Sequence, residues 1–198
     1  MLRIENQLAS ASQRRDEQLT FSLRCGIAGL VPPLNDALAG LGLRPDPTAH
    51  ILLLIDLPCG FVLRTLQTAR WTNERVVVMT ENSCPDYWED LWALQPAGLV
   101  VGIQFDRAFI DTLVRVARGE RLRLTPDRPS PLTINERALL RTVACGWDNA
   151  RIARQFHVED KTVRNALTRV YTKLGVANRV EATLYYWGRL DLCTSARW

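Results

Sequence analysis

The chain has 198 residues, of which 47% are apolar, and its formal net charge is +4. This length accommodates one large domain or two small ones, and the apolar content is sufficient for a packed core. No run of about 18 apolar residues is present, which excludes a membrane-spanning helix. Because the first twenty residues are polar with scattered charges, we expect no signal peptide.

Cysteine usage indicates a reducing, cytoplasmic setting. The five cysteines are odd in number and widely spaced, at Cys25, Cys59, Cys84, Cys145 and Cys193. No pair has metal-ligand spacing, so we expect neither a metal nor a cofactor, and most of these thiols should be small buried groups. A redox sensor at Cys59 or Cys84 is the alternative.

The N-terminal half alternates apolar strand-like and amphipathic helix-like segments. The strands are expected at residues 20–28, 50–56, 75–80 and 98–103, and the helices at 32–41, 60–69, 85–94 and 106–118. The segment HILLLID is continuously apolar, as parallel strands are when both faces are covered. Strand–helix alternation of this kind predicts a doubly wound α/β sheet.

Residues 20–123 resemble the receiver domain of bacterial response regulators. LRCGIAGLVP resembles its first strand and loop, LLLIDLP its phosphoacceptor strand, VVVMT the strand ending in Thr or Ser, and FIDTLVRVARGE its last helix. The resemblance implies Asp56 as the acceptor and Thr80 as its neighbour. The acidic pair of the family is replaced by Gly29 and Leu30, and its lysine by Gly102.

One carboxylate does not make a Mg²⁺ site, since this ion needs several hard oxygen ligands. Without it, charge on a transferred phosphoryl group is not neutralised. We therefore expect a pseudo-receiver, with Asp56 capping a loop or bonding backbone amides. Phosphorylation of Asp56 is the alternative.

The connection between the first helix and HILLLID is too short for a complete receiver. Residues 42–49 separate them, whereas a parallel crossover needs a dozen or more residues. A reduced second strand and helix would leave a four-stranded sheet in the order 1-3-4-5. An N-terminal arm, residues 1–19, or a partner chain would then cover the new edge.

Residues 124–131, LTPDRPSP, contain three prolines and are expected to form a semi-rigid linker. Residues 132–192 then form the second domain and residues 193–198 a tail. Residues 1–131 carry 14 Arg and 15 acidic residues, whereas residues 132–198 carry 11 basic and 6 acidic ones. The positive field therefore belongs to the second domain.

Four helices are expected in that domain. Thr133 and Glu136 form a capping box for the first, which ends near Gly146. The second covers residues 149–156, and a turn at 157–159 leads to Asp160 as N-cap of the third. Asn178 caps the fourth, at about residues 179–188. A short helix, a turn and a longer basic helix predict a helix-turn-helix.

The third helix, KTVRNALTRVYTKL, is amphipathic in an unusual way. Its apolar residues share one face at helical spacing, and the opposite face is basic and hydrogen-bonding with no acidic side chain from Lys161 to Leu174. This pattern suits a polyanion, and the major groove of DNA is wide enough for the helix. The alternative is a solvated basic helix that takes part in a protein contact.

LT-x-x-E, CGWDNARIA and TVRNALTRVYTKLGVANRVEA resemble the LuxR/FixJ-type DNA-binding domain of bacterial regulators, over residues 132–188. Glu159 and Ala166 depart from the family's Ser and His. The resemblance implies base contacts by Arg164, Asn165 and Thr168. It implies phosphate contacts at Asn149, Lys161, Thr162, Arg169 and Lys173.

The two resemblances together predict an atypical response regulator of the NarL/FixJ type, which binds double-stranded DNA as a homodimer. The dimer candidates are Val180, Leu184, Trp187, Trp88 and Trp92. We find no nucleophile elbow, P-loop or dinucleotide fingerprint and expect no enzyme. A small-molecule or protein modulator at the receiver-like domain, and a protein-interaction antagonist, remain open.

Overall fold

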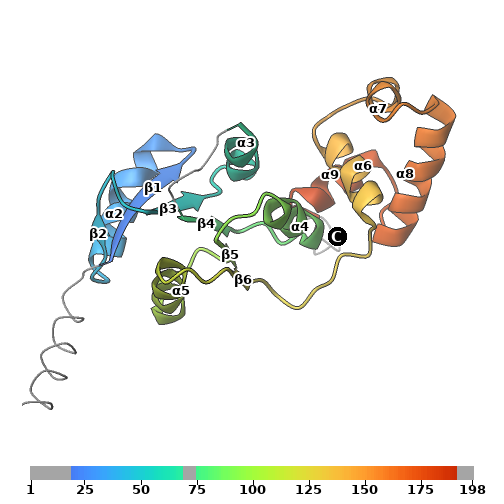
Figure 1. Cartoon of the computed structure of the whole chain (residues 1–198). Helices are drawn as coiled ribbons and strands as arrows, with labels where there is room; N and C mark the ends of the chain where they lie inside the picture. The colour runs from blue at the N-terminus through green and yellow to red at the C-terminus, as the bar shows by residue number, and fades with distance from the viewer. Residues whose placement is uncertain (1–18, 69–74, 191–198) are drawn as a thin grey trace, which may run out of the picture.

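The computed structural model describes residues 19–68 and 75–190. An α/β lobe and a helical lobe meet at helix α4 (Figure 1). The strands of the first lobe are β1 (Thr20–Cys25), β2 (Arg44–Pro45), β3 (Ile51–Ile55), β4 (Arg75–Thr80), β5 (Gly98–Val101) and β6 (Leu122–Leu124). Its helical segments are η1 (Ala28–Leu30), α2 (Val31–Ala39), α3 (Phe61–Thr68), α4 (Pro85–Ala93) and α5 (Arg107–Ala117).

The strands form one sheet in the order β2-β1-β3-β4-β5-β6, and every pairing is parallel. The predicted doubly wound class is confirmed, but the expected four-strand count is wrong. A two-residue remnant of the second strand still pairs with β1. On the other side, β6 forms an additional edge strand, and its last residue, Leu124, is the first residue of the expected linker. No helix lies between β2 and β3, so the short connection removed the helix and left a strand remnant.

Loss of that helix changes one face of β1. The register pairs Ser22 with Leu52 and Arg24 with Leu54, so these side chains share the face that α3 and α4 cover further along the sheet. Arg24 is exposed, whereas Leu52 and Leu54 are buried. Polar residues thus occupy the part of the sheet from which a covering helix is missing. Of the arm proposed to cover this edge, residues 1–19, all but Leu19 lie outside the described residues.

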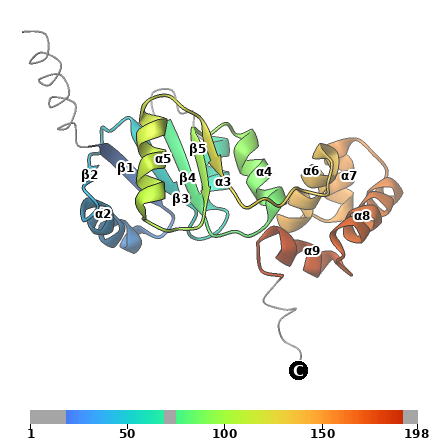
Figure 2. The same ribbon diagram turned by 90° about the horizontal axis from the view of Figure 1, so that it is seen from below.

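Helices cover both faces of the sheet (Figure 2), which separates two apolar cores. On one face, α2 and α5 pack against Phe21, Leu53 and Val77. On the other face, α3 and α4 pack against Leu52 and Val78, and this core continues without interruption into the helical lobe. The two lobes therefore share a hydrophobic core.

The helical lobe consists of four helices: α6 (Ile134–Ala144), α7 (Asn149–Phe156), α8 (Asp160–Leu174) and α9 (Arg179–Tyr186). The capping box of Thr133 and Glu136 is confirmed, as is the Asn178 cap of α9. The predicted Asp160 cap is wrong: Glu159 occupies the N-cap position without a side-chain hydrogen bond, and Asp160 is the first residue of α8.

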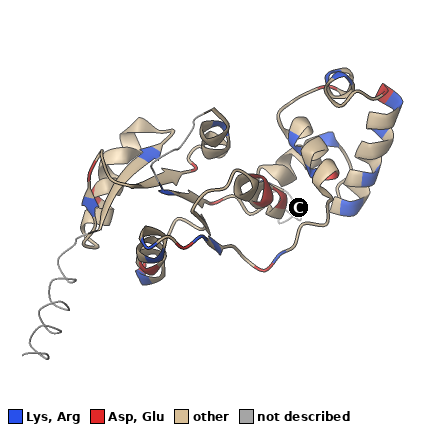
Figure 3. Cartoon of the chain, viewed as in Figure 1, with Lys and Arg blue, Asp and Glu red and all other residues tan. Residues whose placement is uncertain are grey.

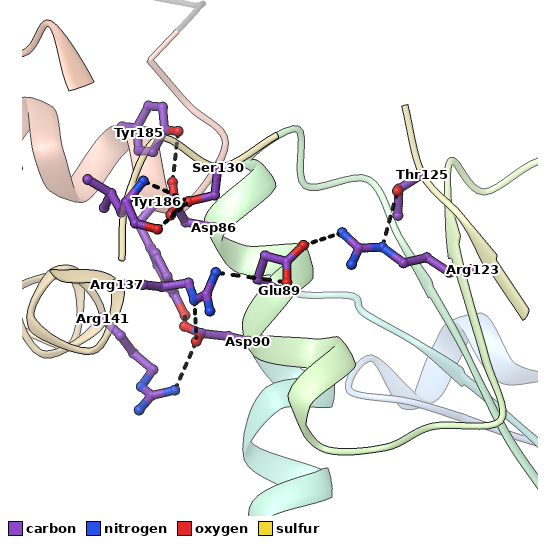
Figure 4. Close-up of polar contacts among 11 residues, drawn as sticks. Asp86, Glu89, Asp90, Arg123, Thr125, Ser130, Arg137, Arg141, Tyr185 and Tyr186 are labelled. Atoms are coloured by element: carbon purple, nitrogen blue, oxygen red, sulfur yellow. Dashed lines mark hydrogen bonds and ion pairs between the residues drawn. The ribbon is translucent and has the colours of Figure 1, made fainter. Parts of the chain in front are cut away.

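Buried aspartates of α4 join the lobes (Figure 4). Tyr186 Oη donates to Asp90 at 2.7 Å and Tyr185 Oη donates to Asp86 at 2.9 Å. Arg141 Nη1 lies 3.1 Å from Asp90. Burial raises the pKa of Asp90, while Tyr186 and the two arginines Arg141 and Arg137 lower it. Because each carboxylate has donors from the helical lobe, separating the lobes would leave both charges without these partners.

Candidate nucleic-acid interface

Helix α8 exposes one continuous polar face. Its apolar residues Val163, Leu167 and Val170 are buried in the lobe. The exposed residues are Lys161, Thr162, Arg164, Asn165, Thr168, Arg169, Thr172 and Lys173. Figure 3 shows basic residues along this helix, with an acidic residue only at its beginning. Positively charged and hydrogen-bonding side chains thus lie on one side of a helix that fits the width of the major groove.

Helix α7 holds α8 in position. Asp148 caps α7 by accepting from Arg151 N at 2.7 Å, and His157 ends it in the left-handed conformation at φ 54°. The chain reverses there within a few residues before α8 begins. Ile152 and Ala153 of α7 are buried in the same core as Val163 of α8. A tight turn and a shared apolar core thus fix the angle between the two helices.

Arg164 is already engaged within α8. Its Nε and Nη2 lie 2.9 and 2.6 Å from Asp160 Oδ2, one turn earlier, and the Arg164 side chain remains 69% exposed. The pair holds the guanidinium on the polar face at the beginning of the helix. An exposed i,i+4 pair of this kind stabilises a helix by only about 0.3–0.5 kcal/mol, so a better partner displaces it easily.

Two of the expected phosphate contacts are bonded to other helices. Lys173 Nζ lies 2.7 Å from Glu136 Oε2 of the α6 capping box, and this contact with the Thr133 bonds lowers the pKa of Glu136 to about 2. Asn149 Oδ1 accepts from Arg179 Nη1 at 3.1 Å. Lys161, Thr162 and Arg169 lie exposed on the same helix as Arg164.

The carboxylate of Asp56, the expected phosphoacceptor, accepts hydrogen bonds from three groups of the protein. Asp56 is 2% exposed. Its Oδ1 accepts from Val62 N at 3.0 Å, and its Oδ2 accepts from Thr80 Oγ1 at 3.0 Å and Tyr87 Oη at 2.7 Å. Gly102 N donates to the Thr80 carbonyl at 2.8 Å. Asp56 thus fastens β3 to β4 and α4.

The residues around Asp56 do not fit Mg²⁺. Gly29 and Leu30 lie in η1 after β1 and supply no carboxylate, and both oxygens of Asp56 already accept hydrogen bonds. Across the described ranges, no three His, Cys, Asp or Glu side chains gather closely enough to hold a metal ion.

The two candidate redox thiols are protonated in this environment. Burial raises the pKa of Cys59 to about 11 and that of Cys84 to about 12. A thiol reacts with oxidants through its thiolate, so neither side chain has the environment of a redox sensor.

The five dimer candidates lie in different surroundings. Trp88 is 1% exposed, in the shared core, and Trp92 packs beneath Arg121 at 3.9 Å. Trp187 contacts the α/β lobe, where its ring lies 5.9 Å from that of Tyr87. Val180 is 67% exposed on α9 and Leu184 is half-buried. In this arrangement Val180 is the candidate most accessible to another chain.

Sequence reasoning did not identify the Asp160–Arg164 pair or the α4 aspartates that bind the helical lobe. The Asp160–Arg164 pair could have been predicted, since an acidic residue four positions before an arginine on a helix commonly pairs with it. Asp86 and Asp90 gave no such signal, because their partners are 99 and 96 residues away.

A parallel α/β lobe joined to a helix-turn-helix with an exposed basic second helix defines a two-domain DNA-binding regulator. Within the described residues, no helix has both the length and the apolarity to cross a membrane. Comparison with known proteins agrees with the class. Residues 130–186 match the model of the luxR family of bacterial regulatory proteins.

Two curated relatives match across both lobes. The probable transcriptional regulatory protein SgaR of Hyphomicrobium methylovorum is 29% identical over 168 residues, 80% of this chain and 79% of that protein. The transcriptional regulatory protein DesR of Bacillus subtilis (strain 168) is 25% identical over 134 residues, 65% of this chain and 67% of that protein.

Solved structures show the same fold. The response regulator RcsB in complex with DNA gives a TM-score of 0.52 at 18% identity, covering 88% of this chain and all of that one. RcsB from Salmonella enterica serovar Typhimurium, bound to a promoter, gives 0.53 at 17% identity, covering 87% and 99%. The chain therefore has the architecture of a response regulator with a LuxR-type C-terminal domain, and it is a DNA-binding transcriptional regulator of that kind.

Proposed function

We propose that this chain binds specific sites on double-stranded DNA in the bacterial cytoplasm as a homodimer, and that it regulates transcription without conventional aspartyl phosphorylation. The observation that carries the DNA proposal is the exposed polar face of α8, which lacks acidic side chains from Lys161 onward. Arg164 matches guanine O6 and N7, and Asn165 matches adenine N6 and N7.

A mobility-shift titration on the DNA upstream of the chain's own gene tests the base contacts. Arg164→Ala and Asn165→Ala are each expected to cost about 1–3 kcal/mol at the specific site and to relax base preference at one position. Arg169→Ala should weaken binding to all DNA sequences alike, and it should reduce the slope of log affinity against log salt concentration by about one. Arg107→Ala, an exposed arginine of α5, is the control.

Unchanged site affinity in both Arg164→Ala and Asn165→Ala would refute the assignment of α8 as the recognition helix. Tight binding to another protein by a chain with no DNA affinity would instead favour an interaction antagonist.

The dimer proposal rests on α9. Its C-terminal half contacts α4 through Tyr185 and Tyr186, while Val180 near its beginning is exposed. An exposed apolar residue on this helix is available to the same residue of a second copy across a two-fold axis. Sedimentation of the DNA complex should give two chains per site, and Val180→Glu should reduce this to one. A two-chain complex with the variant would place the contact elsewhere.

The proposal against phosphorylation rests on Asp56, since a phosphoryl group on Oδ1 would have to displace Val62 N, and one on Oδ2 would have to displace the Thr80 and Tyr87 hydroxyls. With acetyl phosphate and Mg²⁺, we expect no rise in the thermal unfolding midpoint and no phosphorylated species by mass spectrometry. Saturable stabilisation that disappears in Asp56→Asn would establish the opposite, a phosphorylated response regulator.

A further inference from the structure

A cleft of about 490 Å³ lies between the two lobes. Helix α3 forms one wall, and α6, α7 and the residue that ends α9 form the other. Sites for small molecules commonly measure about 300–1,000 Å³ and lie between domains. The cleft is separate from Asp56, which is enclosed beneath Tyr87, and from the exposed face of α8.

Three aromatic rings line the cleft, and two of them have contacts that orient them. Trp147, Phe156 and Trp187 belong to its wall. Trp187 Nε1 donates to the Ala144 carbonyl at 3.1 Å, and its ring lies so close to Gly60 that a Cβ there would be 3.0 Å away. Arg151 covers the Trp147 ring at 4.1 Å. Rigid flat rings favour a flat aromatic ligand.

Two arginines from opposite lobes supply positive charge. Arg64 comes from α3 and Arg141 from α6. Arg141 also binds Asp90, whereas the Arg64 guanidinium has no hydrogen bond or ion pair in the part of the chain that the structure describes. None of the described residues lining the cleft is a carboxylate. An exposed and unpaired guanidinium beside aromatic walls is suited to a carboxylate, sulfonate or phosphate.

Charged side chains from both lobes lie close enough to act on the Cys145 thiol in the wall of the cleft. Burial raises the pKa of this thiol and Asp90 raises it further, whereas the charges of Arg141, Arg151 and Arg64 lower it. Arginines from both lobes therefore act on one point in the wall of the cleft.

We propose that this interdomain cleft binds a planar aromatic anion, with the ring system between the tryptophans and the acidic group on Arg64. An uncharged apolar ligand would leave Arg64 without a partner, and a duplex is too large for this volume. Because its walls come from both lobes, a bound ligand is linked to how the lobes are arranged. This inference goes beyond DNA binding and is tested without DNA.

Isothermal titration of the full chain with naphthalene-1-sulfonate provides the test. Its neutral analogue naphthalene-1-sulfonamide has nearly the same shape without the charge. We expect saturable binding of one sulfonate per chain, about tenfold weaker in Arg64→Gln, which corresponds to the loss of one charged hydrogen bond. Arg107→Gln on α5 is the matched control and should bind like the original chain.

Ala138→Leu tests the location by volume, since Ala138 lines the cleft and the larger side chain fills it. We expect it to abolish binding, with cooperative unfolding retained as a check on folding. The proposal is overturned by no saturable heat up to millimolar sulfonate, by equal affinity for the sulfonamide, or by unchanged affinity in Arg64→Gln.

Discussion

At the scale of single residues, Asp56 connects several elements through the donors to its carboxylate. Tyr87 Oη, Thr80 Oγ1 and Val62 N all donate to its carboxylate. Tyr87 also accepts from Gly60 N at 3.2 Å, and its ring lies 5.5 Å from that of Tyr186. The carboxylate that follows β3 is therefore connected through one phenol to the helical lobe.

Tyr87→Phe should destabilise the chain by about 1–3 kcal/mol, because it leaves a buried carboxylate with one donor fewer. Urea unfolding followed by circular dichroism measures this. Tyr171→Phe is the control, since the Tyr171 hydroxyl forms no hydrogen bond within the described residues. Equal loss in the two variants would show that the bond to Asp56 contributes nothing beyond the loss of a hydroxyl.

At the scale of elements, α8 has one ion pair near each end, the first within the helix and the second to α6. Asp160 engages Arg164 at the beginning of α8, and Glu136 of α6 engages Lys173 at its end. The same Glu136 accepts from Thr133 N at 2.9 Å, so one carboxylate caps α6 and holds α8. This side chain thus adds a polar contact between α6 and α8 to the apolar packing that orients them.

This contact predicts a pH dependence. The folded-state pKa of Glu136 is lowered from 4.5 to about 2 by Lys173 and Thr133. Its contribution to stability is therefore present above pH 4.5 and is lost as the pH falls through that range towards 2. Urea unfolding of the chain and of Glu136→Gln at several pH values should show a smaller decline with acid in the variant.

Lys173→Met separates the two causes, since it removes the lysine and keeps the capping box. It should reduce the acid-dependent decline in part. An identical pH profile in all three chains would contradict the lowered pKa of Glu136.

At the scale of the whole molecule, the lobes form a common core around α4 rather than two units joined only by a linker. Tyr87 and Trp88 of α4 belong to the same apolar cluster as Leu140 and Tyr186. Hydrogen bonds that Asp86 and Asp90 accept from Tyr185 and Tyr186 add an orientational constraint to this apolar contact. We infer that the relative position of the lobes is set by the packing of α4.

Gly60→Ala should loosen that contact. Gly60 has φ +90°, and a Cβ there would lie 3.0 Å from the Trp187 ring. Gly42→Ala introduces a Cβ at a similar φ of +84°, but no atom lies within 4 Å of it. Hydrogen–deuterium exchange of the backbone amides of residues 124–131, between the lobes, should accelerate in Gly60→Ala and not in Gly42→Ala. Equal rates would show that only local backbone strain matters.

The amino-acid pattern predicted most of the individual elements, for a clear physical reason. Arg75–Thr80 has the predicted bounds, and α7 runs from Asn149 to Phe156 as expected. Apolar periodicity and capping residues act over a few neighbouring positions, so they are readable along the chain. The Asp160 cap failed because α8 begins one residue earlier than expected, which places Asp160 inside the helix, where its carboxylate pairs with Arg164.

The extent of the sheet was less predictable. A short connection correctly indicated that the second crossover was reduced, but Arg44–Pro45 still pairs with β1 and Leu122–Leu124 adds an edge to β5. Strands of two or three residues carry no usable periodicity. Their pairing depends on which backbone groups the neighbouring strand leaves open, and only the assembled sheet determines that.

The sequence by itself determined that this chain has a receiver-like α/β lobe and a LuxR-type helix-turn-helix, because both depend on local periodicity, capping and residue type. It also determined that the acidic pair is missing, since Gly29 and Leu30 have no carboxylate in any fold. Only the tertiary structure decided that Asp56 is enclosed by Tyr87, and that Asp86 and Asp90 bind Tyr185 and Tyr186. Those partners are far apart along the chain, and packing alone brings them together.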